Sequence, residues 1–164
     1  STATMWDKIN IAYTNRNQPL MYGLATDDSH NYHEFGTAFS NAGRGWVMVQ
    51  AEGLDAASLI NAMEAGKFYA STGVEFKTLI VEKNEIRIDI AEEKDVTYTI
   101  DFIGVKKGEN DSKVIESVKG SSATFKITDE YLFVRAGVTS TKQKYNPFED
   151  GDFEMAWTQP VAYK

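Results

Sequence analysis

The stretch LFVRAGV, residues 132–138, carries an apolar side chain at every second position, on Leu132, Val134, Ala136 and Val138. Successive side chains of a β-strand point to opposite faces of a sheet, so a period of two is typical of a strand with one buried face. The stretch therefore predicts a strand with one buried face.

This period recurs through the second half of the chain, on Ile86, Ile88 and Ile90, on Tyr98, Ile100 and Phe102, and briefly on Phe125 and Ile127. Turn-forming stretches, KKGENDS at 106–112 and VKGSS at 118–122, separate these runs. Six or seven short strands about ten residues apart are typical of an antiparallel β-sandwich. In the last extended segment, MAWTQPVAYK, Pro160 lacks a backbone N–H and should keep the segment at an edge or end of a sheet.

The sequence before Gly73 has a different character. Two apolar runs, LMYGLAT at 20–26 and WVMVQA at 46–51, predict short buried strands. A helix is predicted over residues 55–66, where the apolar residues of one helical face are Ala56, Leu59, Ile60 and Met63. Asp55 is a candidate N-cap and Gly66 a candidate C′ residue of this helix. The chain is therefore predicted to be α+β and mainly β.

Composition limits the classes of function. The 164 residues suit one ordinary domain, or a small domain and part of another. The net charge of −7, without a long run of like charges, argues against a nucleic-acid partner. The absence of cysteine excludes disulfides and thiolate metal sites. No apolar stretch approaches the roughly 18 residues of a membrane-spanning helix, so we expect no membrane partner. A cytoplasmic and an exported location both remain open.

The segment ATDDSHNYHEF, residues 25–35, contains both histidines of the chain, His30 and His33, directly after Asp27 and Asp28. It is open to three interpretations. It is a polar loop in which an aspartate caps a turn, or it holds a catalytic acid–base pair, or Asp28 and His30 bind a metal ion. The third rests on spacing, since residues two apart on a strand point to the same side. A carboxylate with an imidazole suits zinc, manganese or iron, but a catalytic zinc usually has three protein ligands.

Three stretches together resemble the C-terminal portion of a protein of the PHP family, the polymerase and histidinol phosphatase superfamily of metal-dependent phosphoesterases. They are GLATDDSHNYHEFG at 23–36, GRGWVMVQAEGLDAASLINAMEAGKFYASTGV at 43–74, and AWTQPV at 156–161. The resemblance is most specific over residues 20–74, whereas residues 75–155 match only in character.

The resemblance implies a distorted (β/α)7 barrel with a metal cluster at the C-terminal ends of its strands. It also implies hydrolysis of a phosphate ester by a metal-activated hydroxide, with a divalent zinc, manganese or iron ion as cofactor. The Asp-x-His motif of the family's last barrel strand falls on Asp28 and His30, which are thereby implied to be metal ligands. Asp27 beside the motif, His33 outside it, and Arg44, which could approach a phosphate, are further candidates. The alternative for Arg44 is a loop arginine without an anion role.

The chain departs from the family pattern, because it has no His-x-His motif and no histidine before His30. We therefore expect residues 1–74 to be the C-terminal remnant of a PHP barrel and residues 75–164 to be an accessory β-sandwich. The expected partners are the missing N-terminal part of the barrel and a phosphate-ester substrate. Exposed barrel strands also favour self-association. Since Asp28 and His30 alone should bind metal weakly, the isolated chain is expected to be inactive and to hold little or no metal.

An alternative from another class is a binding module, in which the β-sandwich recognises a carbohydrate or a protein partner. Recognition by stacking requires an exposed row of aromatic side chains on one sheet face. The candidates for such a row are Tyr98, Tyr131 and Trp157. Core packing is the default for aromatic residues on alternating strands, so burial of these three would remove the support for stacking.

Overall fold

The structure is a computed structural model that describes residues 2–82 and 84–163. Its helices are α1 (Thr2–Thr14) and α2 (Ala56–Glu64), and neither is long and apolar enough to cross a membrane. Its strands are β1 (Trp46–Val49), β2 (Phe68–Ser71), β3 (Phe76–Glu82), β4 (Glu85–Ile90), β5 (Tyr98–Lys106), β6 (Lys113–Lys119), β7 (Ser122–Lys126), β8 (Tyr131–Gln143) and β9 (Phe153–Thr158).

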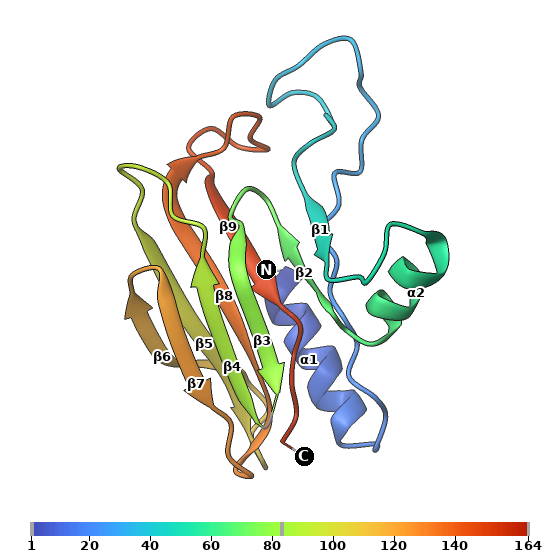
Figure 1. The fold of residues 1–164 in the computed structure, drawn as a ribbon, viewed down its shortest axis with the longest axis vertical. Helices are drawn as coiled ribbons and strands as arrows, with labels where there is room; N and C mark the ends of the chain where they lie inside the picture. Colours follow the sequence, from blue (N-terminus) through green and yellow to red (C-terminus); the bar gives the residue numbers. More distant parts are fainter. Residues whose placement is uncertain (1, 83, 164) are drawn as a thin grey trace.

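These strands form two antiparallel sheets that pack face to face (Figure 1). The larger sheet has the strand order β1-β2-β9-β8-β5-β6, and the smaller has the order β3-β4-β7. α1 lies against the outer face of the larger sheet, whereas α2 lies beyond the β1 edge and projects away from both sheets. The predicted class, α+β and mainly β, is confirmed.

The hydrophobic core fills the space between the two sheets. Its most buried side chains include Ile86 and Ile88 of β4, Ile100 and Phe102 of β5, and Val134, Ala136 and Val138 of β8. The residues predicted to share a buried face on these three strands are therefore in this core, except Leu132, which is half-buried and packs on the α1 side of the larger sheet. The other face of β8 is also covered, since Phe133 packs with Ile11 of α1 and with Val105. The stretch LFVRAGV is thus buried on both faces, because α1 shields the side that faces away from the smaller sheet.

Residues 20–26 form no strand, so the prediction of a buried strand there is wrong. Side chains, not a neighbouring strand, satisfy this backbone. Gln159 accepts from the N–H of Gly23 at 2.8 Å and donates to its C=O at 2.9 Å. Asn10 in the same way accepts from the N–H of Met21 at 2.7 Å and donates to its C=O at 3.2 Å. Because these groups already have partners, the segment crosses the molecule as irregular chain.

α2 confirms the predicted helix and both of its caps. Asp55 accepts a hydrogen bond from the N–H of Ser58 at 3.0 Å, and Gly66 follows the helix with a left-handed φ of 70°. The predicted apolar face is only partly covered, since Leu59 and Met63 are half-buried but Ile60 is 54% exposed, and the buried residue of the helix, Ala62, lies outside the predicted set. The capping residues and the local pattern therefore define this helix more than its tertiary contacts do.

The predicted strand WVMVQA forms β1, which pairs with β2, and β2 pairs with β9. One sheet thereby joins residues 46–71 to the last strand, across the boundary expected near residue 74. β9 lies between β2 and β8, so of the two positions expected for the segment that contains Pro160, an edge or an end, the edge is wrong. Pro160 lies beyond the end of β9, where the sheet does not need its missing N–H.

Candidate functional site

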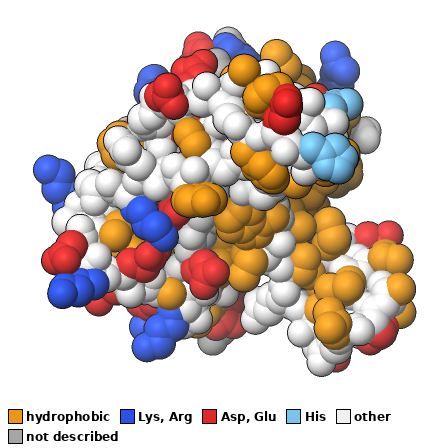
Figure 2. All heavy atoms as spheres, turned by 90° about the horizontal axis from the view of Figure 1, so that it is seen from above, with side chains coloured by type: hydrophobic (Ala, Val, Ile, Leu, Met, Phe, Trp, Pro, Cys, Tyr) orange, Lys and Arg blue, Asp and Glu red, His pale blue; other side chains and the backbone are white. Residues whose placement is uncertain are grey.

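Both histidines lie in a long loop, residues 25–45, that extends beyond the end of the larger sheet (Figure 1). His30 and His33 are exposed, and Figure 2 shows their imidazoles on the surface of the molecule. The only regular pairing within the loop is an isolated bridge between Asn31 and Asn41. A small set of polar side chains therefore holds this loop in shape.

Asp27 ties the beginning of the loop to its end. One carboxylate oxygen accepts from the N–H of Gly43 at 2.8 Å, and the other accepts from Arg44 at 2.7 Å and Gly45 at 2.6 Å. Partial burial raises the pKa of Asp27, but the backbone hydrogen bonds and the Arg44 charge outweigh it and hold the pKa below its ordinary value. Asp27 thus caps the turn before β1, and both of its carboxylate oxygens are used by backbone N–H groups of that turn.

Arg44 directs its guanidinium into the loop. The side chain donates to the carbonyl of Phe39 at 2.7 Å and to that of Gly36 at 3.0 Å, and Nε and Nη2 reach Oδ1 of Asn146 at 3.3 and 3.2 Å. The ring of Phe148 lies 5.9 Å from the guanidinium carbon. Arg44 is 7% exposed, so it links the loop to the β8–β9 connection and is not presented to a phosphate in solution.

Asn41 completes the polar interior of the loop. It is fully buried and donates to the carbonyls of Asn31 at 3.0 Å and Glu34 at 2.8 Å, while its Oδ1 accepts from the N–H of Gly36 at 3.0 Å. Neither Asn41 nor Asn146 was identified from the sequence. An asparagine in a polar loop has the same local pattern whether it is buried or exposed, so no signal marked them in advance.

Asp28 and His30 are placed differently from Asp27, because both are exposed. Asp28 has a left-handed φ of 49°, which aspartate tolerates better than most residues. Its carbonyl lies 2.6 Å from His30 Nδ1. A carbonyl can only accept, so Nδ1 carries the proton and the lone pair of the neutral ring lies on Nε2. Histidines that bind metals usually have this arrangement, with one ring nitrogen held by the protein and the other free.

These two side chains do not complete a metal site. Across residues 2–82 and 84–163, no three His, Cys, Asp or Glu side chains gather closely enough to hold an ion. His33 is exposed elsewhere on the loop, and Asp27 points inward. A carboxylate and an imidazole suit zinc, manganese or iron, but a stable site at this position needs further ligands.

The aromatic residues considered for sugar stacking do not form an exposed row. Tyr98 and Tyr131 are 6% and 9% exposed and belong to the core between the sheets, and Trp157 is half-buried. Recognition of a carbohydrate by stacking on these residues therefore loses its support.

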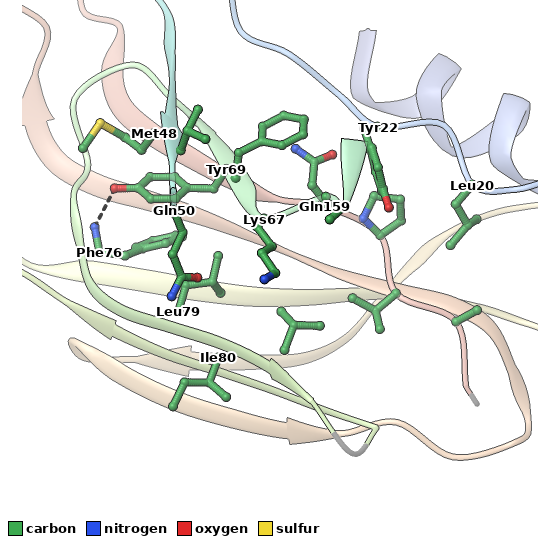
Figure 3. A pocket seen from close by; sticks show the side chains of 18 of the residues that line it. Leu20, Tyr22, Met48, Gln50, Lys67, Tyr69, Phe76, Leu79, Ile80 and Gln159 are labelled. Carbon is green, nitrogen blue, oxygen red and sulfur yellow. Dashed lines mark hydrogen bonds between the residues drawn. The ribbon is translucent and has the colours of Figure 1, made fainter. Parts of the chain in front are cut away.

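A groove of ≈ 860 Å³ lies where the edges of the two sheets meet (Figure 3). Its lining comes from β1, β2 and β3, from residues 18–22 and from residues 159–162. At its floor, the rings of Tyr69 and Phe76 stack with centroids 4.3 Å apart, and the N–H of Phe76 donates to the Tyr69 hydroxyl at 2.9 Å. Burial raises the pKa of Tyr69, so the phenol is neutral at physiological pH.

Comparison with known proteins provides no relative, since no family model matches the chain and no curated protein or solved structure matches it significantly.

Proposed function

We propose that this chain is the C-terminal part of a metal-dependent phosphoesterase of the PHP superfamily, in which Asp28 and His30 supply two metal ligands. The observation that carries the proposal is the 2.6 Å contact between His30 Nδ1 and the carbonyl of Asp28. This contact leaves Nε2 free on an exposed, oriented ring. It occurs at the Asp-x-His motif that resembles the last metal motif of the family.

Each loop residue has a separate role in this proposal. A bound divalent zinc, manganese or iron ion would supply an activated hydroxide and neutralise charge on the phosphoryl oxygens. Asp28 contributes a carboxylate and His30 a neutral imidazole. Asp27 and Arg44 position the loop that carries them, because their own polar atoms are used in internal hydrogen bonds. Arg44 is therefore proposed to shape the site and not to bind phosphate.

The remaining ligands are proposed to come from another part of the intact protein. The described residues gather no third ligand beside Asp28 and His30. With only two ligands and no closed cavity, the chain alone is expected to bind metal weakly and to hydrolyse no phosphate ester at a measurable rate.

The test uses the product of the complete reading frame that contains this chain. Metal content is measured by elemental analysis, and hydrolysis is measured with p-nitrophenyl phosphate. Asp28→Asn removes the carboxylate charge but keeps a residue that tolerates the left-handed φ, and His30→Ala removes the imidazole. Both variants are expected to lose metal affinity and activity by at least about tenfold.

His33→Ala is the matched control, because His33 is an exposed histidine of the same loop outside the motif. It is expected to keep both metal and activity. If the protein binds no metal, or if Asp28→Asn and His30→Ala retain all of it, the segment is a polar loop capped by Asp27 and the proposal is wrong.

A further inference from the structure

The two sheets differ in width, and the groove lies at this difference. Beyond β3 the smaller sheet ends, whereas the larger sheet continues to β2 and β1. β3 residues 76–81 form one wall of the groove, and β1 and β2 residues form the other. In Figure 3, the polar ends of Gln50 and Lys67 reach from the β1–β2 side toward Leu79 and Ile80 of β3. The groove therefore lies where a further strand of the smaller sheet could pair with β3.

The hydrogen bonds of β4 show which way the β3 backbone faces. The N–H of Ile90 donates to Ser121 on the β7 side at 2.7 Å, and the N–H of Ala91 donates to Glu75 on the β3 side at 2.9 Å. Alternate residues of an antiparallel strand bond to opposite neighbours. The β4 residues that bond to β3 are thus Arg87 and Asp89.

In β3, the residues opposite Arg87 and Asp89 are Ile80 and Thr78. The intervening residue Leu79, and then Val81, therefore direct their N–H and C=O groups away from β4 and toward the groove. Within the part of the chain that the structure describes, these groups have no hydrogen-bond partner. An edge with unpaired groups of this kind is a template for pairing with an extended segment.

The charge of the groove indicates the chemistry of such a segment. Lys67 and Lys77 are the charged side chains that line it, and no Asp or Glu does so. Lys67 forms no ion pair among residues 2–82 and 84–163, whereas the charge of Lys77 lies near Asp89 of β4 and helps to hold the pKa of that carboxyl below its ordinary value. An unpaired Lys67 and a second lysine, in a lining without carboxylates, favour a segment that carries carboxylates of its own.

Apolar side chains complete the lining. Tyr22, Met48 and Val81 are 39%, 36% and 44% exposed at its surface, and Leu79 packs partly into the core. Alternate side chains of an added strand would meet these surfaces, while its backbone bonds to β3.

We propose that this groove binds an extended acidic peptide from a partner protein, which pairs with the free edge of β3 and places carboxylates near Lys67 and Lys77. This site is separate from Asp28 and His30, so it stands or falls independently of the phosphoesterase proposal.

The probe is a fluorescein-labelled, end-capped peptide of alternating valine and threonine with an aspartate at each end. Its control is the same peptide with lysine at each end. Fluorescence anisotropy with the full chain is expected to show at least about tenfold tighter binding of the aspartate peptide. Reversing both charges, with Lys67→Glu and Lys77→Glu together, should abolish this preference. Lys119→Glu should not, because Lys119 is also an exposed lysine but lies on β6, outside the groove.

Amide hydrogen exchange followed by NMR identifies the strand that pairs. Bound peptide should slow exchange at Leu79 and Val81, while Thr78 and Ile80, which already face β4, change little. The proposal is overturned if neither peptide binds, if both bind equally, or if protection falls on β1 instead. It is also overturned if Leu79 and Val81 become protected without peptide as the chain dimerises in sedimentation, because a second copy would then be the occupant.

Discussion

Asp7 of α1 and Arg135 of β8 form a bidentate ion pair across 128 residues of sequence, with Nε to Oδ1 and Nη2 to Oδ2 both at 2.7 Å. Both side chains are only 3% exposed. Ser112 donates a further hydrogen bond to Asp7 at 2.6 Å, and the ring of Trp6 lies 5.2 Å from the guanidinium carbon. This pair fixes the position of α1 on the outer face of the larger sheet.

Asp7→Ala is expected to destabilise the protein by about 3–5 kcal/mol, because it leaves the buried charge of Arg135 without a partner. Urea unfolding measures the change. Glu109→Ala is the control, since it breaks an exposed pair with Lys113 and should cost less than about 1 kcal/mol. If Asp7→Ala does not fold, the double variant Asp7→Leu with Arg135→Met, which removes both charges, should recover a folded chain. If Asp7→Ala and Glu109→Ala lower the free energy of unfolding equally, the buried pair stabilises the protein no more than an exposed pair does.

Asp27→Asn should loosen the loop, because a neutral amide replaces the carboxylate that accepts three backbone N–H groups. Hydrogen exchange at Gly43, Arg44 and Gly45 is expected to accelerate by at least about tenfold. Asp28→Asn is the matched control and should leave these amides unchanged, since Asp28 makes none of these bonds.

The same carboxylate predicts a pH dependence. The folded pKa of Asp27 is lower than the ordinary value of 3.8, so its contribution to stability is complete above 3.8. That contribution is lost as the pH falls through the lower, folded pKa. The difference in free energy of unfolding between the wild type and Asp27→Asn should therefore shrink below 3.8. A difference that stays constant in urea titrations from about pH 6 to about pH 2 would contradict this prediction.

Glu154 should make stability depend on pH in the opposite direction to Asp27. Burial raises its pKa above the ordinary value of 4.5, and the ion pair with Lys142, at 3.3 Å, offsets only part of this effect. The folded state then holds its proton more tightly than the unfolded state does. The contribution of Glu154 to stability is therefore lost as the pH rises from its ordinary pKa through its raised, folded-state pKa. Relative to Glu154→Gln, the wild type should lose free energy of unfolding across this interval, and a gain there would refute the prediction.

Gly66 tests the C-terminal cap of α2. Its φ of 70° disfavours any side chain, and an added Cβ would lie 2.6 Å from Cζ of Tyr22. Gly66→Ala is expected to cost about 1–2 kcal/mol, from the left-handed backbone and from displacement of the Tyr22 ring. Gly108→Ala isolates the backbone part, because Gly108 has a φ of 86° and no atom within 4 Å of an added Cβ. Thermal unfolding of both variants measures how much each one is destabilised. Equal destabilisation would mean that the Tyr22 ring moves aside without cost.

Local patterns in the sequence predicted several elements correctly. The alternation on Ile86, Ile100 and Val134 marked β4, β5 and β8, and the apolar period with Asp55 and Gly66 marked α2 and its caps. These features depend on residues two to four positions apart, so they can be recognised without knowledge of distant contacts. The Asp-x-His motif directed attention to Asp28 and His30 in the same way, although their metal-binding role remains a prediction.

Distant partners decided the rest. Residues 20–26 have the apolar composition of a strand, but the side chains of Asn10 and Gln159 bind the backbone groups of Met21 and Gly23, and no strand forms. β9 became an interior strand because β2, more than eighty residues earlier, pairs with it at Tyr69 and Thr158.

The loop follows the same rule. Four charged or ring-nitrogen side chains, Asp27, Asp28, His30 and Arg44, are equally prominent in the sequence, yet the fold turns Asp27 and Arg44 inward and leaves Asp28 and His30 exposed. Asn146, about a hundred residues away, accepts from Arg44 and keeps it buried. Residue type and spacing therefore define which chemistry the chain can offer. The direction of each side chain depends on hydrogen-bond partners that come together only when the sheets assemble.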